Sequence, residues 1–256
     1  MWQIVKWFLL IITLLLLGII LIAFVYYHLY MQMNPKTRAA AESAFQSGVT
    51  IEDEQNDFVM METNKEEPNE NNPSPYRLQY LDIKLLQLGA DDNYIYYKVT
   101  FQEMIPRSGT KVGNDQILDP GMKLNLVDNQ NQDYAILDLG YSYLPLGLSN
   151  IGTYYFYGPT GIIWPEEKRF LHQDHDSKIF GGPGYEYVMG AFPLKKLGLS
   201  INQEVNLALS IEARSRKYSH AAVDNLGGEG KIPGIITWKI GSKQFVIDNQ
   251  RRGQGY

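Results

Sequence analysis

The sequence predicts an all-β protein: an antiparallel β-sandwich preceded by one N-terminal transmembrane α-helix. The helix is predicted by 21 uncharged residues, Trp7 to Tyr27. The sandwich is predicted by short runs of alternating apolar and polar residues from position 76 onward, with Gly and Pro in the gaps between them. Such strands form two sheets that bury their apolar faces against each other.

The uncharged N-terminal stretch has the length of a membrane span. At about 1.5 Å per helical residue it extends roughly 31 Å, the thickness of the hydrocarbon core of a bilayer. Trp7 at one end and Tyr26 and Tyr27 at the other are the aromatic residues expected at the two membrane interfaces. A cleaved signal peptide is the alternative, but it has a shorter apolar region and small residues before the cleavage site. We therefore predict an uncleaved anchor.

The orientation of this anchor follows from its flanks. Lys6 stands before the helix, and Lys36 and Arg38 stand after it, so the positive charges nearly balance. A six-residue head is easily retained, whereas a long C-terminal body is the part that is normally exported. We predict a single-pass protein of the cell membrane, with a cytoplasmic N-terminus and an extracytoplasmic C-terminal domain. The chain has no cysteine and hence no disulfide.

Charge divides the chain into parts. The predicted division is a short head (1–6), the anchor helix (7–30), a juxtamembrane segment with an acidic flexible linker (31–75), the β-sandwich (76–248) and a tail (249–256). Residues 1–75 contain four basic and nine acidic residues, whereas the rest of the chain is neutral. An acidic, Asn- and Pro-containing stretch predicts a self-repelling spacer. Within it, residues 58–61 are an alternative short strand, and Pro35 is a suitable start for a short helix.

Each element of the sandwich follows from its own pattern. Two alternating runs flank the acidic turn at 89–93 and predict a hairpin half-buried on one side. Two further runs flank the polar turn at 128–133, and Pro193–Leu199 suggests a single helical turn. The runs are 81–85, 95–101, 122–126, 135–139, 205–213 and 235–240. A neutral body with no basic stripe argues against nucleic acid as a partner.

Two segments resemble a known family. Residues 91–101 (DDNYIYYKVTF) and 185–199 (YEYVMGAFPLKKLGL) resemble the early hairpin and the late Glu-bearing strand of DOMON-like and family-nine carbohydrate-binding-module domains. Together the two motifs and their spacing cover most of 78–240. The resemblance implies a β-sandwich of a superfamily that contains sugar-binding, haem-binding and purely accessory domains.

Sugar binding makes aromatic side chains the candidates. The resemblance implies that a sugar lies between two tryptophans, and the body contains two, Trp164 and Trp238. Tyrosines in a Gly- and Pro-rich stretch could be presented by loops at one end of the sandwich: Tyr141, Tyr143, Tyr154, Tyr155 and Tyr157. Packing is the alternative for all of these aromatic residues, and Trp238 alternates with Ile236 and Ile240 as a core residue would.

Calcium and haem are the candidate cofactors. Hard oxygen ligands for calcium occur in two sets, Asp91, Asp92 and Asn93, and Asn129, Asn131 and Asp133. Neither set completes a calcium loop, and Asx turns are the alternative for both. The resemblance implies a b-type haem held by Met with His or Lys, and no spacing selects a pair. The available ligands are His172, His175, His220, Met104, Met122 and Met189.

Motifs of catalysis do not occur. The chain contains neither G-x-S-x-G nor H-E-x-x-H, and residues 225–232 depart from a phosphate loop at two positions. We therefore expect no enzyme, but a non-catalytic module that the helix anchors in the lipid bilayer and that binds a glycan or envelope polymer. A structural subunit that binds other membrane or envelope proteins is the alternative, and a haem-containing electron-transfer domain is the second.

Overall fold

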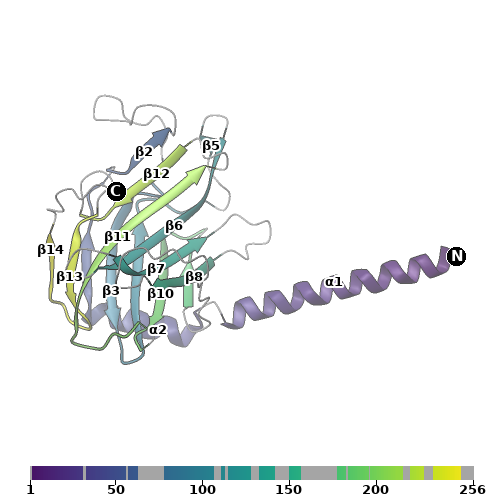
Figure 1. The fold of residues 1–256 in the computed structure, drawn as a ribbon, viewed down its shortest axis with the longest axis horizontal. Coiled ribbons are helices and arrows are strands. Elements are labelled where there is room, and N and C mark those ends of the chain that lie inside the picture. Colours follow the sequence, from purple (N-terminus) through teal and green to yellow (C-terminus); the bar gives the residue numbers. More distant parts are fainter. Residues whose placement is uncertain are drawn as a thin grey trace.

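The computed structural model describes residues 2–30, 33–55, 57–62, 78–106, 111–112, 115–127, 133–141, 150–156, 178–182, 184–195, 197–215, 220–227 and 233–248. This part contains two helices and fourteen strands (Figure 1). The strands form two antiparallel sheets, and α1 extends away from them. The prediction of a β-rich protein behind one N-terminal apolar helix is confirmed.

Helix α1 (Trp2–Tyr30) is 29 residues long and apolar. Its segment Trp2–Ile22 is long and apolar enough to cross a membrane, and none of it is buried against the rest of the protein. The side chain of Trp7 is exposed. Tyr26 and Tyr27 lie in the last turns of the helix, where the side chains are outside the described part. An exposed apolar surface of this size is typical of a segment that contacts a membrane or a partner protein.

Helix α2 (Pro35–Ser47) follows after a short break. Asn34 caps it by accepting a hydrogen bond from the Thr37 backbone N–H at 2.9 Å, and Pro35 occupies the first helical position. The short juxtamembrane helix considered from the sequence is therefore present. Ala41, Ala44 and Phe45 form its buried face.

The first sheet has five strands in the order β1-β3-β4-β10-β9. Their bounds are β1 Val49–Glu52, β3 Ile83–Ala90, β4 Tyr94–Phe101, β9 Lys178–Gly181 and β10 Tyr187–Pro193. Strands β3 and β4 are the predicted hairpin, turning at Asp91–Asn93. Its second face was expected to meet solvent, but α2 covers it, so Tyr96 is as buried as Tyr97.

The second sheet has nine strands, with β14-β13-β11-β6-β7-β8 as its main path. Strand β12 pairs with β11 and β2, and β5 pairs with β6. Their bounds are β2 Val59–Glu62, β5 Lys111–Val112, β6 Asp115–Val127, β7 Asp133–Tyr141, β8 Asn150–Phe156, β11 Glu204–Ser215, β12 His220–Asn225, β13 Ile235–Lys239 and β14 Phe245–Asp248. Strands β6, β7, β11 and β13 coincide with predicted alternating runs.

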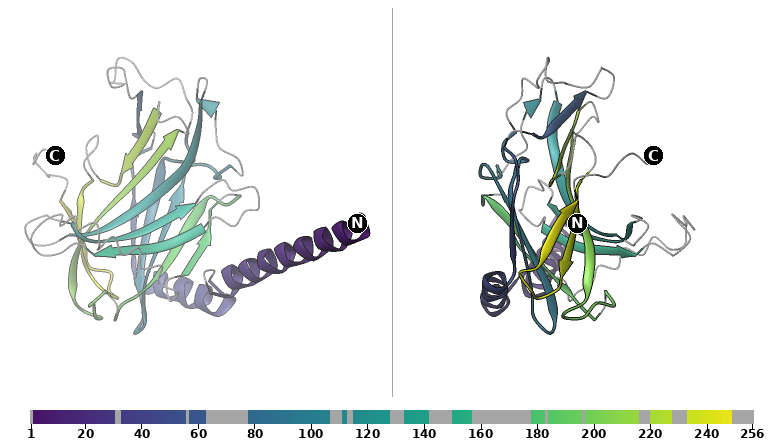
Figure 2. Two further views of the ribbon diagram at one scale, coloured as in Figure 1. Left: turned by 45° about the vertical axis from the view of Figure 1, so that its right-hand side comes forward. Right: turned by 90° about the vertical axis from the view of Figure 1, so that its left-hand side faces the viewer.

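One hydrophobic cluster joins the two sheets. It contains Leu86 and Leu88 of β3 together with Leu124 and Leu126 of β6 and Trp238 of β13. A second cluster lies on the opposite face of the first sheet, under α2. The first sheet is thus covered on both sides, and Figure 2 shows α2 as its outer layer.

The approach of α2 to the sheet requires glycine. A Cβ atom on Gly89 of β3 would lie 2.7 Å from the Ala44 carbonyl carbon, and one on Gly48 would overlap the Leu88 carbonyl oxygen. Both obstacles are backbone atoms, which cannot rotate away. Any side chain at these two positions would lift the helix from the sheet.

The domain boundary drawn from the sequence differs from the structure. Residues 33–55 and 57–62 were assigned to the linker, yet α2 packs on the first sheet, β1 pairs with β3, and β2 pairs with β12. The acidic composition that begins at Glu52 concealed two short strands, and the helix considered from the sequence packs on the sheet instead of belonging to a spacer. Strand β2 is the docked strand that was the alternative for residues 58–61. Residues 63–77 of the predicted linker lie outside the described part.

Candidate functional site

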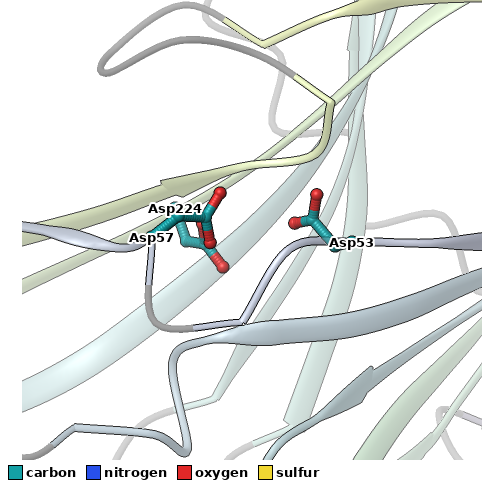
Figure 3. Close-up of side chains that lie close together, drawn as sticks. All are labelled: Asp53, Asp57 and Asp224. Carbon is teal, nitrogen blue, oxygen red and sulfur yellow. The ribbon is translucent and has the colours of Figure 1, made fainter.

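Three aspartates converge where the chain passes from one sheet to the other (Figure 3). Asp53 directly follows β1, Asp57 stands shortly before β2, and Asp224 belongs to β12. One carboxylate oxygen of each lies within 4.8 Å of the others. We call these three residues the carboxylate cluster, and residues 53–55 together with Asp57 the crossover.

Backbone hydrogen bonds hold the cluster in place. The Asp53 backbone N–H donates to the Lys84 carbonyl at 3.2 Å, and its Oδ1 accepts from the Gly227 N–H at 3.1 Å. Asp224 is only 1% exposed, and both of its oxygens accept hydrogen bonds, at 2.5 Å from the Ile83 N–H and at 2.9 Å from the Asn225 N–H. The cluster therefore connects β1, β3, β12 and the turn after β12.

Burial makes these carboxyls weak acids. It raises the pKa of Asp224 to about 8 and the pKa of Asp53 to about 7, against the opposing effect of their backbone N–H partners. The charges of Asp57 and of the buried Asp82 add to both shifts. Partial burial also raises the pKa of Asp57. Near neutral pH, the cluster therefore holds protons.

A shared proton explains the arrangement better than a metal ion does. Calcium takes six to eight oxygen ligands, whereas both oxygens of Asp224 and Oδ1 of Asp53 already accept hydrogen bonds from backbone N–H groups. The Oδ2 atom of Asp53 is buried without a hydrogen-bond partner, which a proton on a neighbouring carboxyl can supply. We interpret the cluster as a proton-binding group.

A second group of side chains fastens α2 to the first sheet. The Arg38 guanidinium lies 4.2 Å from the centroid of the Phe180 ring in β9, and the Lys98 ammonium lies 4.5 Å from that of Tyr187 in β10. Lys98 also forms an ion pair with Glu42 of α2 at 3.3 Å. Cations over aromatic rings, together with the apolar contacts of Ala41, Ala44 and Phe45, thus hold α2 against the first sheet.

Three aromatic side chains beside α2 extend toward solvent. The rings of Phe180, Tyr185 and Tyr187 form a triangle with centroid distances of 5.4, 5.6 and 6.2 Å. Tyr185 is 42% exposed. Rings arranged edge to face present an apolar surface with hydroxyl groups at its border.

Among the predicted sugar-binding residues, the structure describes the side chain of Trp238. Trp238 is a core residue at 0% exposure, and its indole N–H donates to the Ser242 carbonyl at 2.9 Å. The packing alternative is therefore correct for this residue, because a sugar cannot reach its ring. The remaining candidates lie outside the described residues or have undescribed side chains: Trp164, Tyr143 and Tyr157, and Tyr141 in β7 with Tyr154 and Tyr155 in β8.

The first of the two sets proposed for calcium forms a turn. Asp91 Oδ1 accepts hydrogen bonds from the backbone N–H groups of Asn93 and Tyr94, each at 2.8 Å, and Oδ2 accepts from the Tyr96 hydroxyl at 2.7 Å. This is the Asx-turn alternative. Burial, together with this bond, raises the pKa of Tyr96. Asp92 is exposed.

The other metal and haem candidates do not meet in the described part of the chain. Asp133 begins β7, whereas Asn129 and Asn131 lie outside the described residues. Met122 belongs to the cluster between the sheets and Met189 to the cluster under α2, so the two face different layers, and Met104 is exposed. His172 and His175 are outside the described residues, and His220 begins β12.

Sequence reasoning missed the carboxylate cluster. Asp53 and Asp57 were counted among the solvated acids of a spacer, and Asp224 belonged to no predicted strand. Their positions in the chain show no common spacing. The pairing of β1 with β3 and of β2 with β12 brings them together.

Comparison with family models, curated proteins and solved structures gives no match. The proposals below therefore rest on the geometry of this chain.

Proposed function

We propose that the protein is a membrane-anchored, non-catalytic scaffold that holds a DOMON-like β-sandwich at the membrane surface, where it contacts a neighbouring membrane or envelope protein. In this proposal α1 spans the bilayer, with the N-terminus cytoplasmic and the body outside the cytoplasm.

One observation carries the proposal: the spacer between anchor and body is only two residues long. Helix α1 ends at Tyr30, and Met33 is already buried, with its backbone N–H donating to the Ile179 carbonyl at 2.9 Å. At about 3.6 Å per extended residue, residues 31 and 32 together add at most roughly 7 Å of reach. The body is therefore held beside the end of α1.

Helix α2 adds a defined orientation to this short distance. It crosses the outer face of the first sheet, from Phe180 in β9 to Gly89 in β3 (Figure 2). A module that searches for a distant polymer gains from a long flexible tether. A body only two residues from the end of α1 is instead held at a fixed distance from the membrane and with one surface facing its neighbours. This geometry suits assembly with a neighbouring membrane protein.

The test is the size and composition of the complex that contains the full chain. We would extract the tagged protein from its native membrane in mild detergent and determine its mass by sedimentation. We expect one complex of reproducible composition, heavier than the monomer. Insertion of about twelve Gly and Ser residues between Gln32 and Met33 should dissolve that complex, because the body is no longer held in place.

The same insertion after Tyr256 is the matched control, since it adds the same flexible residues without changing the tether. This control should keep the complex intact. A monodisperse monomer from the unaltered chain, or a complex that tolerates the insertion after Gln32, would contradict the scaffold proposal.

Glycan binding is the second candidate function, and the exposed ring of Tyr185 favours it. This ring packs edge to face against Phe180 and Tyr187, a geometry that supports stacking on a sugar face. Binding of the detergent-solubilised full chain to a glycan array should then fall on Tyr185→Ala while the melting temperature changes little. Trp164→Ala is the corresponding test for the tryptophan predicted from the sequence. Array binding that neither variant weakens would remove both residues from the candidates.

A further inference from the structure

The crossover joins the membrane-proximal part of the chain to the second sheet. After α2, the chain adds β1 to the first sheet, passes through residues 53–57, and adds β2 to β12 of the second sheet. Strands β1 and β2 are four residues each. So short a segment depends on the contacts of the crossover itself.

Carboxyl groups dominate those contacts. The charges of Asp57 and of Asp82, which stands before β3, act on both Asp53 and Asp224. Asp53 also acts on Asp224, and Glu54 acts on Asp57. Backbone N–H groups of Gly227, Ile83 and Asn225 face the cluster from the remaining sides. Lys84, in the adjoining β3, has an exposed side chain. Like charges at this separation cannot all ionise without a large cost.

We propose that the carboxylate cluster is a proton-dependent clasp, which holds the crossover and β2 against β12 while its carboxyls share protons and releases them when the carboxyls ionise. The released segment leads back through β1 to α2 and the anchor. The clasp thus couples proton activity at the membrane surface to the attachment of the body, and it does not depend on the identity of any partner.

The direction of the effect follows from proton linkage. In the closed structure the pKa of Asp53 is about 7 and that of Asp224 about 8, both above the ordinary 3.8. The closed state therefore binds more protons than the open state between about pH 4 and pH 8. A state that binds more protons loses stability as the pH rises, by up to roughly tenfold in the opening equilibrium for each group and pH unit.

Asp53→Asn is the variant that separates charge from shape. Its side-chain oxygen can still accept from the Gly227 N–H, and its NH2 group takes the place of Oδ2, the buried atom that has no hydrogen-bond partner. That NH2 group can donate toward Asp57 and Asp224. Asp224→Asn is less suitable, because both oxygens of Asp224 already accept from backbone N–H groups.

The experiment is hydrogen exchange of the full chain in detergent micelles, at several values from about pH 5 to pH 9. Protection factors corrected for the intrinsic exchange rate remove the trivial dependence on pH. We expect protection of residues 49–52 and 59–62 to fall by more than about tenfold over this range, while that of the β4–β10 pair stays constant.

Asp53→Asn should reduce the fall without abolishing it, because Asp224 still titrates, whereas Glu52→Gln should leave the fall unchanged. Glu52 is exposed in the same strand, so its substitution removes the same charge outside the cluster. Protection of 49–62 that is independent of pH in the unaltered chain would overturn the proposal, as would equal effects of the two variants. Recovery of protection at pH 9 with stoichiometric calcium would also overturn it, in favour of a metal centre.

Discussion

The N-terminal segment is fastened to the body at two places, and the two fastenings differ in chemistry. Helix α2 is held by apolar packing and by cations over aromatic rings. The crossover is held by carboxyls at 4.8 Å or less from one another. The first depends little on pH, whereas the second changes with every proton that it gains or loses. Within the same stretch of chain, α2 therefore stays packed on the first sheet as the pH changes, whereas the attachment of the crossover depends on pH.

The largest effect should come from the apolar seam of α2. Phe45 is buried between the helix and the first sheet. Phe45→Ala should lower the free energy of unfolding by about 3 kcal/mol, through lost burial and the cavity that remains. Urea denaturation of the full chain in detergent measures the loss. Gln46→Ala, at an exposed position of the same helix, should change it by less than about 0.5 kcal/mol.

A smaller loss is expected where the helix approaches β3 most closely. Gly89→Ala places a methyl group against the backbone of Ala44, which has to move. We expect a loss of about 1–3 kcal/mol and weaker hydrogen-exchange protection in α2. An unchanged stability would mean that α2 shifts on the sheet without cost, and that its packing against β3 is not tight.

The carboxylate cluster should produce a pH-dependent effect of opposite sign. Asp53→Asn removes a carboxyl whose pKa is raised from 3.8 to about 7, so its stabilising effect should grow between about pH 4 and pH 7 and be smaller at pH 5 than at pH 8. The gain at pH 8 should be about 1 kcal/mol, since the site is partly open to solvent. Melting temperatures at the two pH values test this. A gain of equal size at both would place the effect in packing rather than in titration.

The smallest effect is expected from the ion pair between Lys98 and Glu42. Glu42 is largely exposed, so a double-mutant cycle of Lys98→Met and Glu42→Gln should give a coupling energy below about 1 kcal/mol. Lys98→Met alone should cost more than Glu42→Gln, because it also removes the cation over Tyr187. Equal losses for the two would show that the aromatic contact adds nothing.

The carboxylate cluster could not be predicted from the sequence, because the carboxyl of Asp53 reaches a backbone N–H 174 positions away and that of Asp224 one 141 positions away. No local pattern contains such contacts. The acids of residues 52–57 also matched a solvated spacer, and the pairing of β1 and β2 overrode that composition. The burial of Tyr96 was missed for the same reason, since the strand does not show that a helix will cover its outer face.

The sequence by itself determined the elements whose signal lies within one segment. An uncharged run predicted α1, Pro35 and the helix formers after it predicted α2, and period-two alternation predicted β3, β4, β6, β7, β11 and β13. Alternation also indicated that Trp238 faces the core. Tertiary structure alone decided that residues 33–62 belong to the body and that Asp53, Asp57 and Asp224 meet. Periodicity is a property of neighbours along the chain, whereas the pairing of distant strands depends on which surfaces the whole chain buries together.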